Sequence, residues 1–459
     1  MKINKYTATL AALGIVSIAS VAQAANTVIY MTGSTACRSL VYTAMIQGTV
    51  FANGAARVVS GNNSSGASQI VYEGTIAGQT VDVDCTWSGS EAGIASTAGQ
   101  AQLASQILTI PAPNGNGTPT SYNLPNVPTS YLTQASGWTT AATLPSGTNP
   151  DITWADTTQA VSLTPESKYP LNYLGSPGYV TFTLMKGYSS DGGDQSWKDL
   201  VNVTVGGMNQ TLKTPTVCSF LTGNSADTDP VAFCGRNKGS GTRVNALLNC
   251  SFPVANTVDQ YAWTAAGNLS DLYPLNGSGQ EPGILTFVNS YASGQSLTEV
   301  SNDGFDSGGG VAESLEVDQK GQGAILIGYV GISDALTAHN GTSGTGSGPA
   351  TYLSFNGVFE GDQNVINGAY PYWGLETVYG NPSTASQGGS TIQSETATAL
   401  LAGVQTTLGN AGGSVTDSTK AAGACTGTVA TTPKQSVLIP ISAMNVIRNG
   451  DGGFPVPKS

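Results

Sequence analysis

The chain has 459 residues, of which only 10% are charged and 59 are glycine. Its formal net charge of -12 argues against nucleic acid or an anionic membrane as a partner, but it leaves a small anion open, because local hydrogen-bond donors outweigh a distant, screened charge. A chain of this length can build two lobes with separate cores, and the glycine content indicates long, neutral loops.

The N-terminus is typical of a secretory signal peptide. Two lysines precede an apolar run from about Thr9 to Val21. The segment Ala22-Gln23-Ala24 then supplies the small residues that signal peptidase requires. This run is too short to span a membrane, and no later run of about 20 apolar residues follows it. We therefore expect a soluble protein that is periplasmic or secreted, with residues 1–24 removed by cleavage before Ala25.

Six cysteines remain in the mature chain, and none belongs to a C-x-x-C pair. In an oxidising compartment this pattern favours disulfides over a zinc site. The sequence leaves the connectivity open, although proximity along the chain favours a bond between Cys218 and Cys234. The six residues are Cys37, Cys85, Cys218, Cys234, Cys250 and Cys425.

Two strand–turn–helix units are predicted near the N-terminus. Residues 27–31 indicate a strand, and the apolar residues from 37 to 45 recur at helical spacing, with a Gly/Ser/Thr turn between the two segments. Residues 80–87 alternate between apolar and polar and predict a second strand, which a similar turn connects to a helix expected over residues 91–103.

The middle of the chain is less regular. Residues 104–150 are rich in Pro, Asn, Gly and Thr and predict a long loop or a small insertion. A short strand is then predicted over residues 152–155, and Asp156 follows directly after it. Residues 178–186 predict a strand that crosses to a second lobe, and residues 187–228 carry mixed, loop-rich sequence.

A third unit occupies residues 231–250, VAFCGRNKGSGTRVNALLNC. An apolar strand leads to Arg236, then to a Gly-Ser-Gly-Thr turn, and then to a segment whose apolar residues recur at helical spacing. Three helices of the chain are therefore expected to begin at a Gly/Ser/Thr turn directly after a strand.

The C-terminal half completes an alternating α/β pattern. Residues 310–317 and 393–408 predict helices, residues 324–332 and 375–380 predict strands, and residues 339–349 predict a polar loop that holds the single histidine. We expect an α/β fold of two lobes, each a mixed sheet flanked by helices. The first lobe is predicted over residues 25–180 and again over 351–459, and the second over 181–350.

The three turns suit a tetrahedral oxyanion. Helix N-termini present unpaired backbone N–H groups and the positive ends of their dipoles, which together attract anions. Thr35, Ser90, Ser240 and Thr242 would add hydroxyl donors. The guanidinium of Arg236 is a planar fork that can donate to two oxygens of one anion.

Six separated blocks, in the same order and at similar spacing, resemble the periplasmic phosphate-binding proteins of phosphate ABC transporters, which have the type II periplasmic binding protein fold. Together the blocks extend over most of the mature chain. They are TGSTACRSLVY (32–42), SGSEAGI (88–94), DITWADTTQ (151–159), GRNKGSGTR (235–243), GGGVAESLEVDQKGQGAILIGYVGISDA (308–335) and NGAYPYWGLETVYG (367–380).

The resemblance implies that hydrogen phosphate, or a related oxyanion, is captured between the lobes and passed to an ABC permease in the inner membrane. It also implies a monomer without catalytic residues, cofactor or metal. An ionised Asp156 accepts hydrogen bonds only, so it would favour a protonated oxyanion over sulfate. The ligand residues implied by position are Thr35, Ala36, Ser90, Asp156, Arg236, Ser240, Gly241 and Thr242.

Two residues depart from the family pattern. Ala36 stands where a bulkier aromatic residue is usual, which is compatible with binding through the backbone amide. Glu91 follows Ser90 where a small neutral residue is common, so it would either point to solvent or weaken the anion affinity.

Simpler interpretations exist for the same residues. The Gly-Ser-Gly-Thr turn can be an N-cap alone, Arg236 can pair with an acidic residue on the surface, and Asp156 can cap a turn.

A different class of protein is also consistent with the composition. A secreted surface, matrix or adhesion protein can keep the binding-protein fold and use its neutral Gly/Ser/Thr/Asn exterior for assembly. An enzyme ranks third, because a chain with one histidine and no G-x-S-x-G motif lacks the parts of a Ser-His-Asp or His-rich metal mechanism.

Overall fold

The computed structural model describes most of the chain after residue 25. The predicted signal peptide, most of the 104–150 segment and Cys425 lie outside the described residues. The described ranges are 26–54, 56–61, 66–67, 69–100, 107–108, 140–142, 149–256, 258–261, 304–305, 307–320, 324–342, 348–411, 437–448 and 450–458.

One end of the molecule is built on a mixed sheet around β1. The strand β1 (Thr27–Gly33) runs parallel to β4 (Gln79–Thr86) on one side and to β7 (Ile152–Ala155) on the other. β3 (Gln69–Ile76) forms an antiparallel hairpin with β4, and β2 (Arg57–Gly61) pairs with β3 at the edge. The turns after β1 and β7 therefore lie at the same edge of the sheet.

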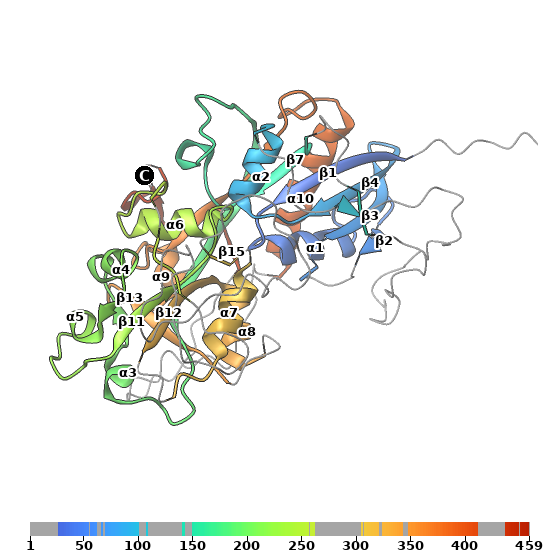
Figure 1. Ribbon diagram of the computed structural model, residues 1–459. Coiled ribbons are helices and arrows are strands. Elements are labelled where there is room, and N and C mark those ends of the chain that lie inside the picture. The colour runs from blue at the N-terminus through green and yellow to red at the C-terminus, as the bar shows by residue number, and fades with distance from the viewer. Residues whose placement is uncertain are drawn as a thin grey trace, which may run out of the picture.

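Helices cover this sheet because their apolar residues face it. In α1 (Arg38–Ile46), Val41, Ala44 and Met45 are buried, as the helical spacing predicted. α1 packs against the long helix α10 (Ile392–Ala411), and α2 (Ser90–Thr97) packs against β7 and β1 (Figure 1).

The other end of the molecule is built on β12 (Ile325–Gly331), which is parallel to β11 (Pro230–Cys234). β13 (Thr351–Phe355) lies beside β8 and is extended by β9 (Asn202–Val203), while β10 (Thr216–Val217) pairs with β11. The helices of this end are α3 (Gln195–Asp199), α4 (Val205–Thr211), α5 (Cys218–Thr222), α6 (Gly241–Asn249), α7 (Gly308–Glu316), α8 (Ile332–Asn340) and α9 (Asp362–Ile366).

One long strand, β8, joins the ends. β8 (Asn172–Lys186) pairs with β14 (Trp373–Gly380) and then continues into the second end, where it pairs with β12 (Figure 1). The predicted two-lobed α/β architecture is confirmed, while the lobe boundaries near residues 180 and 350 stay predictions. The remaining elements are β5 (Ile107–Leu108), β6 (Thr140–Ala142), β15 (Leu438–Pro440), β16 (Val446–Arg448), β17 (Pro455–Pro457) and two 3-10 turns, Gln159–Val161 and Ile441–Ala443.

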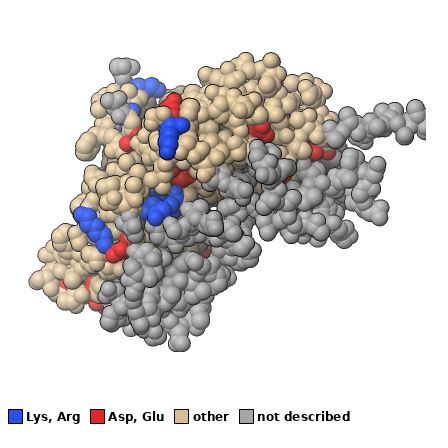
Figure 2. Space-filling view, turned by 45° about the horizontal axis from the view of Figure 1, so that its top comes forward, with Lys and Arg blue, Asp and Glu red and all other residues tan. Residues whose placement is uncertain are grey.

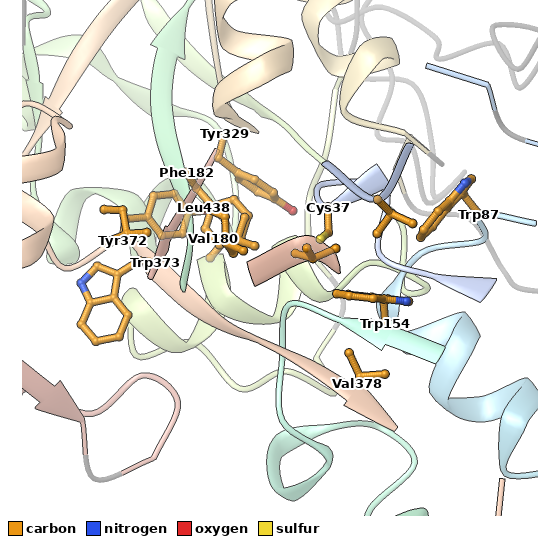
Figure 3. Packing of buried hydrophobic residues seen from close by; sticks show 14 of the residues in the cluster. Cys37, Trp87, Trp154, Val180, Phe182, Tyr329, Tyr372, Trp373, Val378 and Leu438 are labelled. Carbon is orange, nitrogen blue, oxygen red and sulfur yellow. The ribbon is translucent and has the colours of Figure 1, made fainter. Parts of the chain in front are cut away.

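The core is continuous between the lobes. One cluster of buried apolar residues includes Trp154 from the first lobe, Phe182 from β8, Tyr329 from the second lobe, and Tyr372 (Figure 3). The rings of Phe182 and Tyr372 lie 5.5 Å apart, and those of Tyr329 and Tyr372 lie 6.1 Å apart in an edge-to-face arrangement. This packing supports the strands on which the lobes meet.

The described part of one molecular face is mostly neutral. The face seen in Figure 2 shows scattered Lys, Arg, Asp and Glu side chains among a large majority of other residues. In the described part of the chain, no helix is long and apolar enough to cross a membrane.

The predicted disulfide between Cys218 and Cys234 is wrong, because both thiols are free. The backbone N–H of Cys218 donates to the carbonyl of Asp229, and Cys234 lies five residues further along the extended chain. At about 3.3 Å per residue this separates the two Cα atoms by roughly 16 Å, far beyond the reach of a disulfide. The other described cysteines, Cys37, Cys85 and Cys250, are also free and buried.

Three segments differ from the sequence-based prediction. Residues 187–228 contain three helices of five to seven residues, which are too short to show a periodic pattern. Helix α2 ends at Thr97, before the predicted end at residue 103. The predicted loop over 339–349 begins later, because α8 runs to Asn340 and is capped by Gly341 at φ 66°. The single histidine therefore lies in the last turn of a helix.

Candidate anion-binding site

Asp156 is at the centre of the site. It follows β7, whose four residues are all buried, and its side chain is 1% exposed. Its carboxylate accepts a hydrogen bond from Ser90 Oγ at 2.6 Å and another from Thr242 Oγ1 at 2.8 Å. Three segments that are distant in the sequence therefore meet at one buried carboxylate.

The N-terminus of α6 packs directly on this carboxylate. A Cβ atom on Gly241 would lie 1.9 Å from Asp156 Oδ1 and 2.7 Å from Ser90 Cβ, so only glycine allows the approach. The Ser240 hydroxyl accepts from the backbone N–H of Arg243 at 3.3 Å. Ser240 is therefore the N-cap residue of α6, which agrees with the simpler interpretation of the turn. The positive end of the α6 dipole faces Asp156.

The turns that precede α2 and α6 are in contact. The backbone N–H of Ala92 donates to the carbonyl of Gly239 at 3.1 Å. Gly89 has a φ of 95°, and a Cβ atom there would lie 2.5 Å from the same carbonyl oxygen. Since α2 belongs to the first lobe and α6 to the second, these contacts hold the two lobes together beside Asp156.

Arg236 approaches from the end of β11. It is 3% exposed, so it is not the surface arginine of the simpler interpretation. Its Nε donates to the carbonyl of Phe305 at 3.3 Å, and its Nη2 donates to Thr35 Oγ1 at 3.4 Å. The backbone N–H of Arg236 donates to the hydroxyl of Tyr329 at 3.2 Å, which fixes the start of the loop.

Thr35 and Ala36 lie in the turn between β1 and α1. The backbone N–H of Ser34 donates to the carbonyl of Trp154 at 2.8 Å, which holds this turn beside the end of β7. Both Thr35 and Ala36 line a cavity of about 420 Å³ that also borders α8. The structure thus places Ser90, Asp156, Gly241 and Thr242 in one cluster, and the Arg236–Thr35 pair and the Ser240 cap at its margins.

Burial raises the pKa of Asp156. The hydrogen bonds from Ser90 and Thr242 and the charge of Arg236 lower the pKa and oppose that effect. The hydrogen-bond donors and Arg236 therefore favour the ionised form of Asp156, whereas the loss of hydration on burial favours its neutral form.

A second buried carboxylate, Glu376, was not predicted. In the antiparallel pair of β14 and β7, Thr377 lies opposite Ala155, which places Glu376 beside Asp156. Burial raises the pKa of Glu376 strongly, and the nearby Asp156 carboxylate raises it further. Within the described part of the chain, neither carboxylate oxygen has a partner at hydrogen-bond distance. A glutamate in the apolar strand GLETVYG was the available sequence signal.

Glu91 does not point to solvent. It is 3% exposed, and its Oε2 accepts from Ser162 Oγ and from the backbone N–H of Leu163, both at 2.8 Å. Burial raises its pKa to about 7, although both hydrogen bonds lower it. Glu91 thereby ties α2 to the segment after β7, and its effect on anion affinity stays an open prediction.

Asn245 was also missed by sequence reasoning. Its Nδ2 donates to the backbone carbonyl of Asp156 at 2.5 Å and to that of Gly241 at 3.2 Å. It therefore links the first turn of α6 to the end of β7. An asparagine on the buried face of a helix was the only signal in the sequence.

The described residues contain no cluster of His, Cys, Asp or Glu that could hold a metal ion. The fold and the site together define a two-lobed α/β protein in which a buried carboxylate, hydroxyl donors, a helix N-terminus and an arginine converge between the lobes.

No family model and no curated protein matches the sequence. Among solved structures, the chain is similar to a Clostridium perfringens protein solved with bound phosphate, with 12% identity and a TM-score of 0.40 over 82% of this chain and 92% of that one. It is also similar to an ABC-type phosphate transport receptor from Vibrio cholerae, with 9% identity and a TM-score of 0.38 over 84% and 98% of the chains. PstS from Borrelia burgdorferi matches with 11% identity and a TM-score of 0.31 over 78% and 87%. Likenesses at this level carry no argument about the ligand, which has to come from the residues themselves.

Proposed function

We propose that this protein is an exported solute-binding protein that captures hydrogen phosphate, or a related protonated oxyanion, between its two lobes and delivers it to an ABC permease. The observation that carries the proposal is the Asp156 carboxylate. It is buried at the N-terminus of α6 and accepts hydrogen bonds from one hydroxyl group of each lobe. The motif resemblance of the sequence agrees with it.

The chemistry follows from the donors and acceptors present. Arg236 and the amides of α6 can donate to the oxygens of an anion. Ser90 and Thr242, whose hydroxyls donate to Asp156 in this structure, can donate to the anion once they turn away from that carboxylate. Asp156 can only accept when ionised, so an anion oxygen beside it must carry a proton. Hydrogen phosphate meets this requirement at neutral pH, whereas sulfate has no proton to donate and would face an unpaired negative charge.

The arrangement of the lobes suits capture by closure. Ser90 belongs to the first lobe and Thr242 to the second, and both hydrogen bonds meet at Asp156. β8 is the strand that continues from one lobe into the other, so bending along it would separate the two sets of donors. An anion bound by both sets would then favour the closed form.

Calorimetric titration of the mature protein, stripped of bound anion, tests the proposal. At fixed ionic strength we expect phosphate to bind with micromolar or tighter affinity and sulfate to give little heat. Arg236→Ala should weaken phosphate binding at least tenfold, because it removes the buried guanidinium beside Thr35. Lys168→Ala removes an exposed positive charge and serves as the control. Absence of phosphate binding in the wild-type protein would overturn the proposal.

A second candidate is a secreted surface or matrix protein that keeps the fold for assembly. The observation that favours it is the sparsely charged surface, since only 10% of the residues are charged (Figure 2). Concentration-dependent association of a protein that binds neither anion would support this candidate over the first.

A further inference from the structure

A cavity lies beside the candidate anion site and shares with it the turn that holds Thr35 and Ala36. It has a volume of about 420 Å³ and lies between the turn that opens α1 and the helix α8. Thr35 lines this cavity and also accepts the hydrogen bond from Arg236. The cavity therefore begins at a residue that contacts the arginine of the candidate site.

The volume is larger than an inorganic anion needs. Pockets for small organic ligands measure roughly 300–1,000 Å³, and this cavity falls within that range. At roughly 30 Å³ per water molecule, it is equivalent to about fourteen waters. An inorganic phosphate held at Asp156 and Arg236 would leave most of the space to solvent.

Small residues keep the cavity open where the lobes face each other. Ala36 lines it from the first lobe, and Gly331 lines it from the second. A Cβ atom on Gly331 would be 3.9 Å from the Cβ of Ala36, which is an ordinary van der Waals distance. A larger side chain at either position would occupy the space beside Thr35.

The lining mixes polar and apolar residues, and it includes a positively charged and a negatively charged side chain. Arg38 comes from the first turn of α1, whereas Asp334 and Thr337 come from α8. Burial raises the pKa of Asp334, and the charges of Arg38 and Arg236 lower it, so both arginines lie within electrostatic reach of this carboxylate. Oδ2 of Asp334 lies against Gly308 at the start of α7. When ionised, the other carboxylate oxygen accepts hydrogen bonds only, so it would match a hydroxyl group of a ligand. The Asn340 amide both donates and accepts, and the Thr337 hydroxyl, which donates to the carbonyl of Ser333, can accept.

We propose that the natural ligand is a phosphate monoester with a short, hydroxyl-bearing organic substituent, and that this substituent occupies the cavity between α1 and α8. The proposal rests on the proposed function, because the phosphate group of the ester would take the place of the anion at Asp156 and Arg236. The ester oxygen would point past Thr35 and Ala36, and the hydroxyls would reach Asp334 and Thr337.

Titration of the anion-stripped protein with glycerol 3-phosphate and with inorganic phosphate tests the proposal. We expect the ester to bind at least tenfold more tightly than inorganic phosphate. Thr337→Phe places an aromatic ring in the cavity and should weaken ester binding at least tenfold while inorganic phosphate binds as before. Asp334→Asn should weaken the ester selectively, because the amide removes the charged acceptor for its hydroxyls.

Thr406→Phe is the matched control. Thr406 lies in α10, is exposed, and donates its hydroxyl to the carbonyl four residues earlier at 2.8 Å, as Thr337 does at 2.9 Å. The control should leave the affinity for both ligands unchanged.

The outcomes separate this proposal from the function on which it rests. Inorganic phosphate binding as tightly as the ester, or ester binding that survives Thr337→Phe, would overturn the monoester proposal and leave phosphate capture standing. Failure of both ligands to bind would overturn phosphate capture and the monoester proposal together.

Discussion

At the scale of single residues, the site depends on carboxylates whose burial carries a desolvation free-energy cost. Asp156 is compensated by two hydroxyl donors and an arginine, whereas Glu91 has two donors on one oxygen and none on the other. Glu376 has no partner at hydrogen-bond distance among the described residues. A buried carboxylate without full compensation favours its neutral form, so these residues differ in how they respond to pH.

Asp156→Asn tests the basis of anion selectivity. The amide can donate a hydrogen bond as well as accept one, so it no longer requires a proton on the ligand. We expect phosphate to bind about 10- to 100-fold more weakly, equivalent to about 1.5–3 kcal/mol, and sulfate binding to become measurable. Calorimetry with both anions measures the change, and Asp191→Asn, in an exposed turn, is the control. Unchanged discrimination would exclude Asp156 from the ligand site.

Glu91→Gln tests a pH-dependent contribution to stability. Because the folded-state pKa is raised from 4.5 to about 7, the protein binds this proton more tightly when folded. The stabilisation is complete below pH 4.5 and is lost as the pH rises through about 7. Between pH 5 and pH 7 the wild type should lose about 2 kcal/mol of unfolding free energy relative to the glutamine variant.

Urea unfolding at pH 5, 6 and 7 measures this difference. Glu166→Gln, which changes an exposed glutamate, should track the wild type across the same range. Parallel curves for the wild type and Glu91→Gln would show that Glu91 does not titrate in this window.

At the scale of elements, the site is made by helix N-termini that approach one another closely. The approach requires glycine at the contact points, because a Cβ at Gly89 or Gly241 would overlap atoms of the opposite lobe or of Asp156. The first turn of α6 is positioned further by Asn245, which donates to the carbonyls of Asp156 and Gly241. The geometry of the site therefore depends on the seating of α6 against β7.

Gly241→Ala tests this seating. The added methyl group would lie 1.9 Å from Asp156 Oδ1, so α6 must shift and the hydrogen bond between Thr242 and Asp156 should lengthen or break. We expect at least 100-fold weaker phosphate binding with the circular dichroism spectrum of the folded protein retained. Gly206→Ala, in α4, places the same methyl group where nothing lies within 4 Å. The control should bind normally and gain up to about 1 kcal/mol of stability. Normal binding by Gly241→Ala would contradict the packing described.

At the scale of the whole molecule, one core extends through both lobes. Four of the free cysteines lie in it, Cys37 and Cys85 in the first lobe and Cys218 and Cys250 in the second. Cys234 lies in a separate buried cluster of the second lobe. All five are buried, and burial raises the pKa of Cys218 and of Cys234 to about 12. Thiols of this kind are protonated at neutral pH and shielded from reagents.

Thiol titration without reductant tests the cysteine assignment. The folded protein should react slowly with an aromatic disulfide reagent at pH 8, because the buried thiols are protonated and covered. In denaturant at least five thiols per chain should react quickly. A smaller number would mean that at least one of the five described cysteines is oxidised, contrary to the structure.

Much of the local structure was predictable. The strands over 27–31, 80–87 and 152–155 and the helices after Ser34 and Ser240 show clear apolar periodicity, and each lies within a few residues of its predicted bounds. The short helices between 187 and 228 could not be predicted, because five to seven residues do not complete two helical turns.

Part of the site was predictable for the same reason. Ser90 and Thr242 were expected because they stand at helix N-termini, whereas Asp156 was expected from the motif resemblance of residues 151–159. Glu376 and Asp334 gave no comparable signal, since a charged residue in a strand or in a first helical turn is usually solvated. Their places depend on the register of β14 against β7 and on the packing of α8.

The sequence by itself determined three turns with hydroxyl donors and a fold class that alternates strands and helices. These features follow from interactions between residues a few positions apart, which the sequence displays directly. Only the tertiary structure decided that Ser90 and Thr242 share one carboxylate, that Cys218 and Cys234 stay apart, and that a cavity opens beside Thr35. Each of these depends on strand register and on the packing of the lobes, which bring together residues far apart in the sequence. A local sequence pattern carries no information about such long-range contacts.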